Sequence, residues 1–112
     1  MKIPRLSMIT LGVADLQKAT AFYAQALGTP PNTSFGGVTF IQLPGVWVSL
    51  YPLADLAKDI GPDFSAQRSG FSGVTLAHNA RSADDVRAVL AQAAAAGGKI
   101  LKPAQDTFWG GY

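Results

Sequence analysis

Apolar and polar side chains alternate at the start of the chain, over residues 7–13. Ile9, Leu11 and Val13 fall on one side of an extended backbone, and less apolar residues fall on the other. A period of two residues is typical of a strand with one buried face. The sequence therefore predicts a half-buried strand over this stretch.

A helix is predicted directly after this strand. Apolar residues recur at three- and four-residue spacing between Leu16 and Leu27, which places them on one face of a helix. Asp15 precedes the stretch, and its carboxylate can accept hydrogen bonds from the free N–H groups of the first turn. Gly28 can adopt the left-handed conformation that ends many helices, and the prolines that follow prevent continuation.

Three strand candidates follow with no helix between them, over residues 32–36, 38–43 and 46–51. Pro44-Gly45 separates the last two, and this dipeptide favours a tight reversal of the chain. We also expect a short helix over residues 52–59. The first part of the chain, residues 1–59, is therefore predicted to form a βαβββ module.

A polar stretch with glycine near both ends, residues 60–70, is interpreted as a linker. After it, the pattern of the first module begins again. Residues 71–78 alternate with Val74 and Leu76 on one side, so we expect a strand here. A repeat of this kind indicates two copies of one supersecondary unit.

The second copy continues with a helix and stops short of a full module. Ser82, with Asp85 three residues later, favours a helix start of the capping-box kind, and apolar positions at helical spacing follow up to Gly97. One short strand is expected over residues 99–103. Residues 71–112 are thus predicted to be an incomplete second module that shares one domain with the first.

Composition limits the possible chemistry. The chain has 112 residues, of which 48% are hydrophobic and 14% charged, and it contains no cysteine. This length suits one domain, and the lack of cysteine excludes disulfides, thiolate nucleophiles and Cys-ligated zinc. Nine Lys and Arg residues against seven Asp and Glu residues give a formal net charge of +2, but the basic residues are scattered along the sequence. Nucleic-acid binding proteins concentrate such charge on one face, so we expect no nucleic-acid partner.

The order of elements and several short motifs resemble the vicinal oxygen chelate superfamily, which includes glyoxalase I, bleomycin-resistance proteins and extradiol dioxygenases. The motifs are Ile-Thr-Leu-Gly-Val-Ala-Asp-Leu at residues 9–16, Ala-Phe-Tyr-Ala-Gln-Ala-Leu-Gly at 21–28, Gly-Val-Thr-Leu at 73–76 and Gly-Gly-Lys-Ile at 97–100. The resemblance extends over nearly the whole chain. The resemblance implies an α+β fold in which paired βαβββ modules form a cupped mixed sheet with helices on the outer face.

Members of this family end with two more strands, and nothing after Tyr112 supplies them. Either the chain is a piece of a longer one, or a partner chain completes the sheet. An open sheet edge is otherwise prone to aggregation. We therefore expect a homodimer, and domain swapping is one form it can take because the two modules are alike and joined by a long linker.

The resemblance also implies where a metal would bind. Metal-using members place His or Glu ligands near the first strand, late in the fourth, at the start of the second module, and beyond the end of this chain. The matching positions here are Met8, Ser49 and Gly73. These side chains cannot hold a divalent ion as imidazole and carboxylate do. We therefore expect no cofactor, no divalent metal and no metal-dependent glyoxalase or dioxygenase chemistry.

The concave face of the sheet is the expected binding surface, because it is the default cleft of this fold. The predicted ligand-binding residues are Met8, Thr10, Phe40, Gln42, Trp47, Ser49, Tyr51, Thr75, Phe108 and Trp109. For Phe40 and Gln42 the opposite orientation, toward the helices, is equally compatible with the pattern. The alternative for Phe40 and Trp47 is that they fill the cup as core.

Residues suited to acid–base chemistry are few. His78 is the single imidazole, and it shares the alternation of Val74 and Leu76. This position favours a strand-end residue that faces away from the cup over a general base. Asp106 is the one carboxylate that we keep open for a role in a site. No phosphate-binding loop or nucleophile elbow is present, and no catalytic residue is assigned.

The favoured function is metal-free binding of a small, partly aromatic molecule in the cup. The alternative is an enzyme of the same superfamily, lyase or dioxygenase-like, with a divergent active site. A structural interaction module is a third and weaker alternative. No apolar run approaches the ~18 residues of a membrane span, so we expect no membrane contact, and the lack of cysteine fits a cytoplasmic protein.

Overall fold

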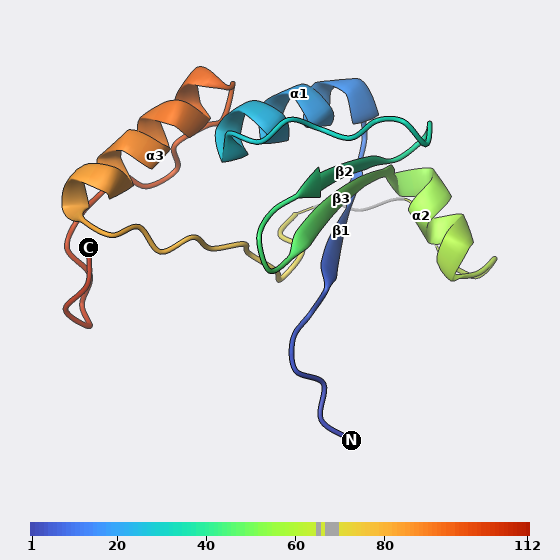
Figure 1. The fold of residues 1–112 in the computed structure, drawn as a ribbon, viewed down its shortest axis with the longest axis horizontal. Coiled ribbons are helices and arrows are strands. Elements are labelled where there is room, and N and C mark those ends of the chain that lie inside the picture. The colour runs from blue at the N-terminus through green and yellow to red at the C-terminus, as the bar shows by residue number, and fades with distance from the viewer. Residues whose placement is uncertain (65, 67–69) are drawn as a thin grey trace.

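The computed structural model describes residues 1–64, 66 and 70–112 (Figure 1). Its elements are β1 (Met8–Val13), α1 (Leu16–Leu27), β2 (Thr39–Gln42), β3 (Trp47–Pro52), α2 (Leu53–Ile60) and α3 (Ala83–Ala95). The strands form one mixed sheet in the order β1-β3-β2. β1 runs parallel to β3, and β2 runs antiparallel to it. The predicted α+β class is confirmed.

The ends of α1 follow from the residues that the sequence singled out. The Asp15 carboxylate accepts a hydrogen bond from the Lys18 N–H at 3.1 Å, which satisfies one of the free donors of the first turn. Gly28 has φ 65°, and the N–H groups of Gly28 and Thr29 donate to carbonyls of the last turn. This is a Schellman-type end, which glycine adopts without the steric cost that a Cβ would add.

One face of the sheet packs against α1. Ile41, Val48 and Leu50 are buried there, and partly buried apolar side chains from β1 and α1 surround them. Thr39 is also buried on this face, and its hydroxyl lies 2.8 Å from the hydroxyl of Thr20 in α1. Because a buried hydroxyl without a partner is costly, this pair lets the helix cover a polar residue.

α2 packs over one end of the opposite sheet face. Its start at Leu53 follows β3 directly, and a Cβ built on Gly12 would lie 2.6 Å from the Leu53 Cδ1 and 3.2 Å from the Leu56 Cδ2. The buried Ala57 belongs to the same helix. Gly12 is therefore the residue of β1 that allows α2 to approach the sheet.

α3 is attached through α1 instead of the sheet, as Figure 1 shows. It begins at the predicted cap, where the Ser82 Oγ accepts a hydrogen bond from the Asp85 N–H at 3.1 Å. The Gln92 side chain donates to the carbonyls of Ala26 at 2.9 Å and of Gln25 at 3.2 Å, near the end of α1. The Gln25 carbonyl also accepts the Gly28 N–H, whereas the bond to Ala26 satisfies a carbonyl that a helix end leaves without a helical partner.

Three predicted strands do not form. Residues 32–36 contribute only an isolated bridge between Asn32 and Phe40, because the Asn32 side chain accepts hydrogen bonds from the backbone N–H and the hydroxyl of Ser34 and so forms a local turn. Residues 71–78 and 99–103 are irregular chain. In the first of these, Gly73 has φ 85°, which interrupts an extended backbone.

Part of the predicted linker is outside the described residues, namely residues 65 and 67–69. The described part begins with the last residue of α2, continues to Gly61, whose N–H donates to the Ala57 carbonyl, and then turns at residues 62–63. Within the described part of the chain, no helix is long and apolar enough to span a membrane.

The second half of the chain packs loosely. The Cα radius of gyration is 15.9 Å, whereas a compact domain of this length has one of about 13 Å. Neither α1 nor α3 contains a fully buried residue. Large apolar side chains that follow α2, including Phe71, Val74 and Leu101, are exposed.

Candidate functional site

The sheet face that points away from α1, here called the distal face, gathers most of the predicted binding residues. Across β1 and β3, Met8 is opposite Trp47 and Thr10 is opposite Ser49. Across β2 and β3, Phe40 is opposite Ser49 and Gln42 is opposite Trp47. Paired residues share a sheet face, so these side chains form one surface.

The register also decides the orientation of β2, which the sequence pattern left open. Thr39 and Ile41 are buried on the α1 side of the sheet. Because successive side chains of a strand point to opposite faces, Phe40 and Gln42 belong to the distal face. Tyr51 follows in β3 at the end where α2 lies, and it is half-buried.

A hydroxyl pair lies in the middle of the distal face. The Thr10 Oγ1 and the Ser49 Oγ are 2.5 Å apart, and Ser49 is only 2% exposed. The bond to Thr10 compensates the burial of the Ser49 hydroxyl. Thr10 itself is exposed, and a hydroxyl has further donor and acceptor capacity beyond one bond. It can therefore hydrogen-bond a molecule that lies on this face.

Aromatic rings stand beside this pair. The ring centroids of Phe40 and Trp47 are 5.9 Å apart at an interplanar angle of 56°, and Phe35 meets Phe40 edge-on at 5.7 Å. Trp47 is 39% exposed and Met8 41% exposed, so neither is core within this chain. The distal face is thus an aromatic surface with a polar centre and no charged side chain among its strand residues.

The remaining predicted residues lie elsewhere. Thr75 is exposed in the irregular segment that follows the linker. Phe108 and Trp109 form the exposed tip of a C-terminal turn, which is closed by the Thr107 N–H donating to the Gly111 carbonyl at 2.8 Å. Figure 1 shows this turn apart from the strands, so the chain does not bring these side chains to the distal face.

The side chains of the distal face do not fit a divalent metal. They offer hydroxyls, one amide, one phenol and one thioether, whereas catalytic metal sites use imidazole and carboxylate ligands. Met8 and Ser49 lie on this face, but Gly73 lies in the irregular segment. Among the described residues, no group of three or more His, Asp or Glu side chains is placed to hold an ion.

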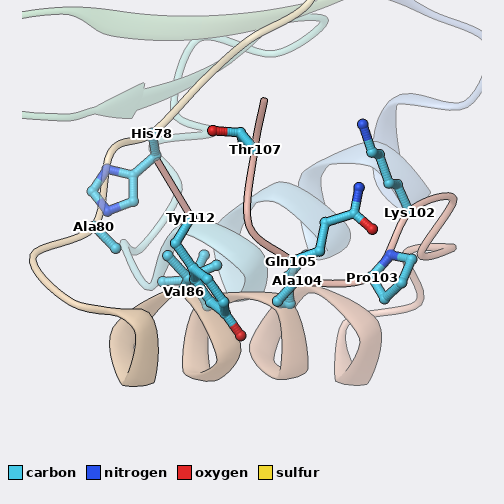
Figure 2. Close-up of a pocket in the computed structure, with 11 residues that line it drawn as sticks. His78, Ala80, Val86, Lys102, Pro103, Ala104, Gln105, Thr107 and Tyr112 are labelled. Atoms are coloured by element: carbon cyan, nitrogen blue, oxygen red, sulfur yellow. The ribbon is translucent and has the colours of Figure 1, made fainter. Parts of the chain in front are cut away.

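The sequence did not predict the pocket between α3 and the C-terminal segment, which has a volume of about 300 Å³ (Figure 2). His78 lines it, together with Lys102 and Tyr112. The expectation that His78 ends a strand is wrong, because residues 71–78 form no strand. The apolar face of α3, with Val86 and Val89 at helical spacing, was the available signal. Asp106 is exposed in the same segment but does not line the pocket.

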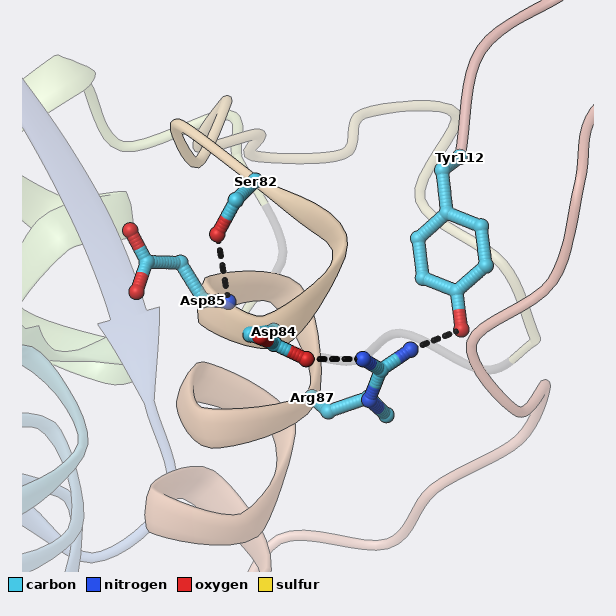
Figure 3. A network of polar contacts seen from close by, with 5 residues as sticks. All are labelled: Ser82, Asp84, Asp85, Arg87 and Tyr112. Atoms are coloured by element: carbon cyan, nitrogen blue, oxygen red, sulfur yellow. Dashed lines mark hydrogen bonds and ion pairs between the residues drawn. The ribbon is translucent and has the colours of Figure 1, made fainter.

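Arg87 of α3 holds the end of the chain against this helix (Figure 3). Its Nη1 donates to the Tyr112 hydroxyl at 2.8 Å, its Cζ lies 5.6 Å from the centroid of the same ring, and its Nη2 pairs with Asp84. The hydrogen bonds to Tyr112 and then to Asp84 raise the pKa of Arg87 above its ordinary value. An arginine guanidinium is protonated at every ordinary pH even without these bonds, so the contact with Tyr112 does not depend on the shift.

A further apolar pocket of about 400 Å³ lies between α1 and the loop that leads to β2. Its lining includes Leu16, Ala24, Pro31 and Val38, and its main polar feature is the threonine pair that joins α1 to the sheet. It contains no ionisable side chain. This pocket could hold an apolar group, but it lacks side chains suited to acid–base or nucleophilic catalysis.

Comparison with known proteins agrees with this architecture. Residues 5–112 match the family model of the Glyoxalase/Bleomycin resistance protein/Dioxygenase superfamily. A glyoxalase-related enzyme from Fulvimarina pelagi has a TM-score of 0.81 and 28% identity, over 96% of this chain and 76% of that chain. A glyoxalase/bleomycin resistance protein/dioxygenase from Nocardioides has a TM-score of 0.76 and 22% identity, over 97% and 72%.

A family enzyme from Burkholderia phytofirmans gives a TM-score of 0.67 at 20% identity, over 95% of this chain and 84% of that chain. No match to the chain exists among the curated proteins. At this level of identity the Nocardioides and Burkholderia structures support the fold alone, whereas the family model spans nearly the full length. The chain therefore belongs to the glyoxalase/bleomycin resistance protein/dioxygenase superfamily.

Proposed function

We propose that the distal face binds a small, neutral, partly aromatic molecule without a metal. The observation that supports this most is the strand register, which puts the hydroxyl pair Thr10 and Ser49 beside the aromatic pair Phe40 and Trp47 on one surface. Small-molecule sites combine apolar and aromatic walls with a few polar groups in this way.

The chemistry of the surface suits a planar ligand. The partly exposed ring of Trp47 offers a face for offset stacking, which contributes roughly 0.5–1.5 kcal/mol beyond the area that it buries. Thr10 and Gln42 can hydrogen-bond a polar substituent of the ligand. Since the strand residues of this face have no charge, a charged ligand would lose its hydration without compensation.

Closure of the site is proposed to come from a second copy of the chain. α2 walls the distal face at Gly12, whereas Met8 and Trp47 at the other end are exposed within one chain. β1 is also an edge strand of the described sheet. A homodimer, domain-swapped or not, would cover both the face and the edge, and size-exclusion chromatography that gives a monomer would contradict it.

An enzyme of the same superfamily remains the alternative. It is supported by the Fulvimarina pelagi structure, which is described as a glyoxalase-related enzyme. Catalysis on the distal face would depend on Tyr51 and the two hydroxyls, because its strand residues include no imidazole and no carboxylate. Stoichiometric zinc, nickel or iron in the purified protein would exclude the metal-free proposal and favour this alternative.

Tryptophan fluorescence tests the proposed site directly, because the chain has only two tryptophans. The variant Trp109→Phe leaves Trp47 as the sole reporter, and Trp47→Phe leaves Trp109. Titration with 2-naphthol, a neutral aromatic probe, should quench the first variant and raise its melting temperature. Quenching confined to the Trp109 reporter would contradict binding at the distal face, as would an unchanged affinity in Trp47→Ala.

A further inference from the structure

The pocket between α3 and the C-terminal segment is built from different residues than the distal face, and none of the distal-face residues lines it. Its floor is one side of α3, where Val86, Val89 and Leu90 recur at the spacing of neighbouring helical turns. Pro103 and Ala104 line it from the C-terminal segment. The floor is therefore apolar and suits the hydrocarbon part of a ligand.

The rim of the same pocket is polar. Figure 2 shows the Thr107 hydroxyl directed toward His78 at one end, and Lys102 with the Gln105 amide at the other. Each of these side chains can donate a hydrogen bond, and Lys102 adds a full positive charge. Rim and floor together favour a molecule that has an apolar body and an anionic group.

The rim of the pocket carries a positive charge that no carboxylate of the pocket neutralises. No Asp or Glu lines the pocket; Asp106 lies between two lining positions, and Asp84 pairs with Arg87. Among the described residues, Lys102 forms no ion pair. An anion near Lys102 would thus meet a positive charge that no carboxylate of the pocket neutralises.

One wall of the pocket is held in place. Tyr112 lines it, and Arg87 fixes this ring by a hydrogen bond of 2.8 Å to its hydroxyl and by a cation–π contact. A wall that is already oriented does not have to be ordered when a ligand binds, and this lowers the entropic cost of binding.

We propose that this pocket binds a small organic carboxylate with a one-ring or short branched apolar body. The carboxylate would lie at Lys102, with the Gln105 amide as a second donor, and the body would lie on Val86 and Val89. A volume of about 300 Å³ is near the lower end of the ~300–1,000 Å³ found for small-molecule sites, which sets the size of the ligand. The apolar floor favours such a molecule over inorganic phosphate.

Isothermal titration with benzoate, and with benzamide as a neutral molecule of the same shape, tests the proposal on the full chain. Benzoate should bind more tightly than benzamide. Lys102→Gln should weaken benzoate binding about tenfold, the effect of one charge-assisted hydrogen bond, and leave benzamide binding unchanged. Lys99→Gln removes the same charge from an exposed residue that does not line the pocket, and should change neither affinity.

The location of binding is checked by amide chemical shifts, which should change in α3 and residues 102–112. Trp47→Ala should leave benzoate affinity intact, so that failure here and failure of the distal-face proposal are distinguishable. Equal affinity for benzoate and benzamide would overturn the proposal. So would equal losses in the two lysine variants, or shifts confined to β1 and β3. Lys102 is exposed, and far-UV circular dichroism verifies that its variant is folded.

Discussion

Two stretches of this chain have the same alternation of apolar residues but different structures. Residues 8–13 form β1, which is paired along its length with β3, whereas residues 71–78 remain irregular and exposed. The two stretches differ in whether another strand pairs with them. β3 supplies β1 with a complete ladder of backbone partners, whereas no described strand pairs with the second stretch. Alternation therefore marks a segment that can be a strand, and pairing decides whether it becomes one.

The same contrast holds for packing. In the first half, α1 covers a core of Ile41, Val48 and Leu50. In the second half, α3 contains no buried residue, and Leu101 is 85% exposed. Since burial of apolar area is the main favourable term in folding, most of the stability should come from the first half.

The largest effect should therefore come from the core. Leu50→Ala removes a fully buried side chain and leaves a cavity, which should lower the free energy of unfolding by about 2–5 kcal/mol. Leu101→Ala is the matched change in the second half, and it should lie within about 0.5 kcal/mol of the parent protein because that side chain is exposed. Urea unfolding followed by circular dichroism measures both.

The control variant Leu101→Ala also tests whether the second half of the chain is less packed than the first. If Leu101→Ala costs as much as Leu50→Ala, the second half is packed in solution against something that this single chain lacks. Repeating the measurement over a range of protein concentrations identifies a second copy as the partner, because only then does the unfolding midpoint depend on concentration.

Local signals predicted the elements of the first half, except for the strand expected at residues 32–36, which forms only an isolated bridge. Asp15 and Gly28 mark the ends of α1, and Pro44-Gly45 marks the reversal between β2 and β3, since each acts through its own backbone or the nearest turn. The strands predicted at residues 71–78 and 99–103 failed for a different reason. Their formation depends on partners far along the chain, which no local pattern specifies.

The contact between β1 and α2 should give the next largest effect. Gly12→Val suits a strand by propensity, but its side chain would collide with Leu53 and Leu56 of α2. Overpacking of this kind should cost about 1–3 kcal/mol in unfolding free energy. Gly61→Val is the control, because a Cβ there meets only the Phe64 ring, at 3.6 Å. Similar losses in the two variants would show that α2 does not pack on β1.

The candidate site was predictable in part. The period of two residues placed Met8, Thr10, Trp47 and Ser49 on one face, and the register agrees. The orientation of Phe40 was not decided by sequence, because both faces of β2 accept the residues present; the burial of Ile41 decides it. The pocket at α3 depends on where the C-terminal segment folds back, which is a tertiary contact with no local signature.

Removing the N-cap side chain of α1 and that of α3 compares the two halves by the same kind of substitution. Asp15→Ala removes the cap of α1 and should cost roughly 1 kcal/mol of global stability, because α1 covers the core. Ser82→Ala removes the cap of α3, and its effect should be seen as faster amide exchange in α3 with less change in global unfolding. A global loss from Ser82→Ala equal to that from Asp15→Ala would mean that α3 unfolds together with the sheet.

The smallest change in unfolding free energy should come from the contact between α3 and the end of α1. Gln92→Ala deletes the side chain that donates to the last carbonyls of α1, at 2.9 and 3.2 Å, in an exposed position. Exposed hydrogen bonds contribute little net free energy because water replaces them, so we expect a loss of about 0.5 kcal/mol. Gln17→Ala makes the same change at an exposed position of α1 for which no such bond exists in the described structure. The rate of amide hydrogen exchange in α3 should rise in Gln92→Ala and stay unchanged in Gln17→Ala. If the exchange rate in α3 is the same in both variants, α3 is held to α1 by apolar contacts and not by the Gln92 amide.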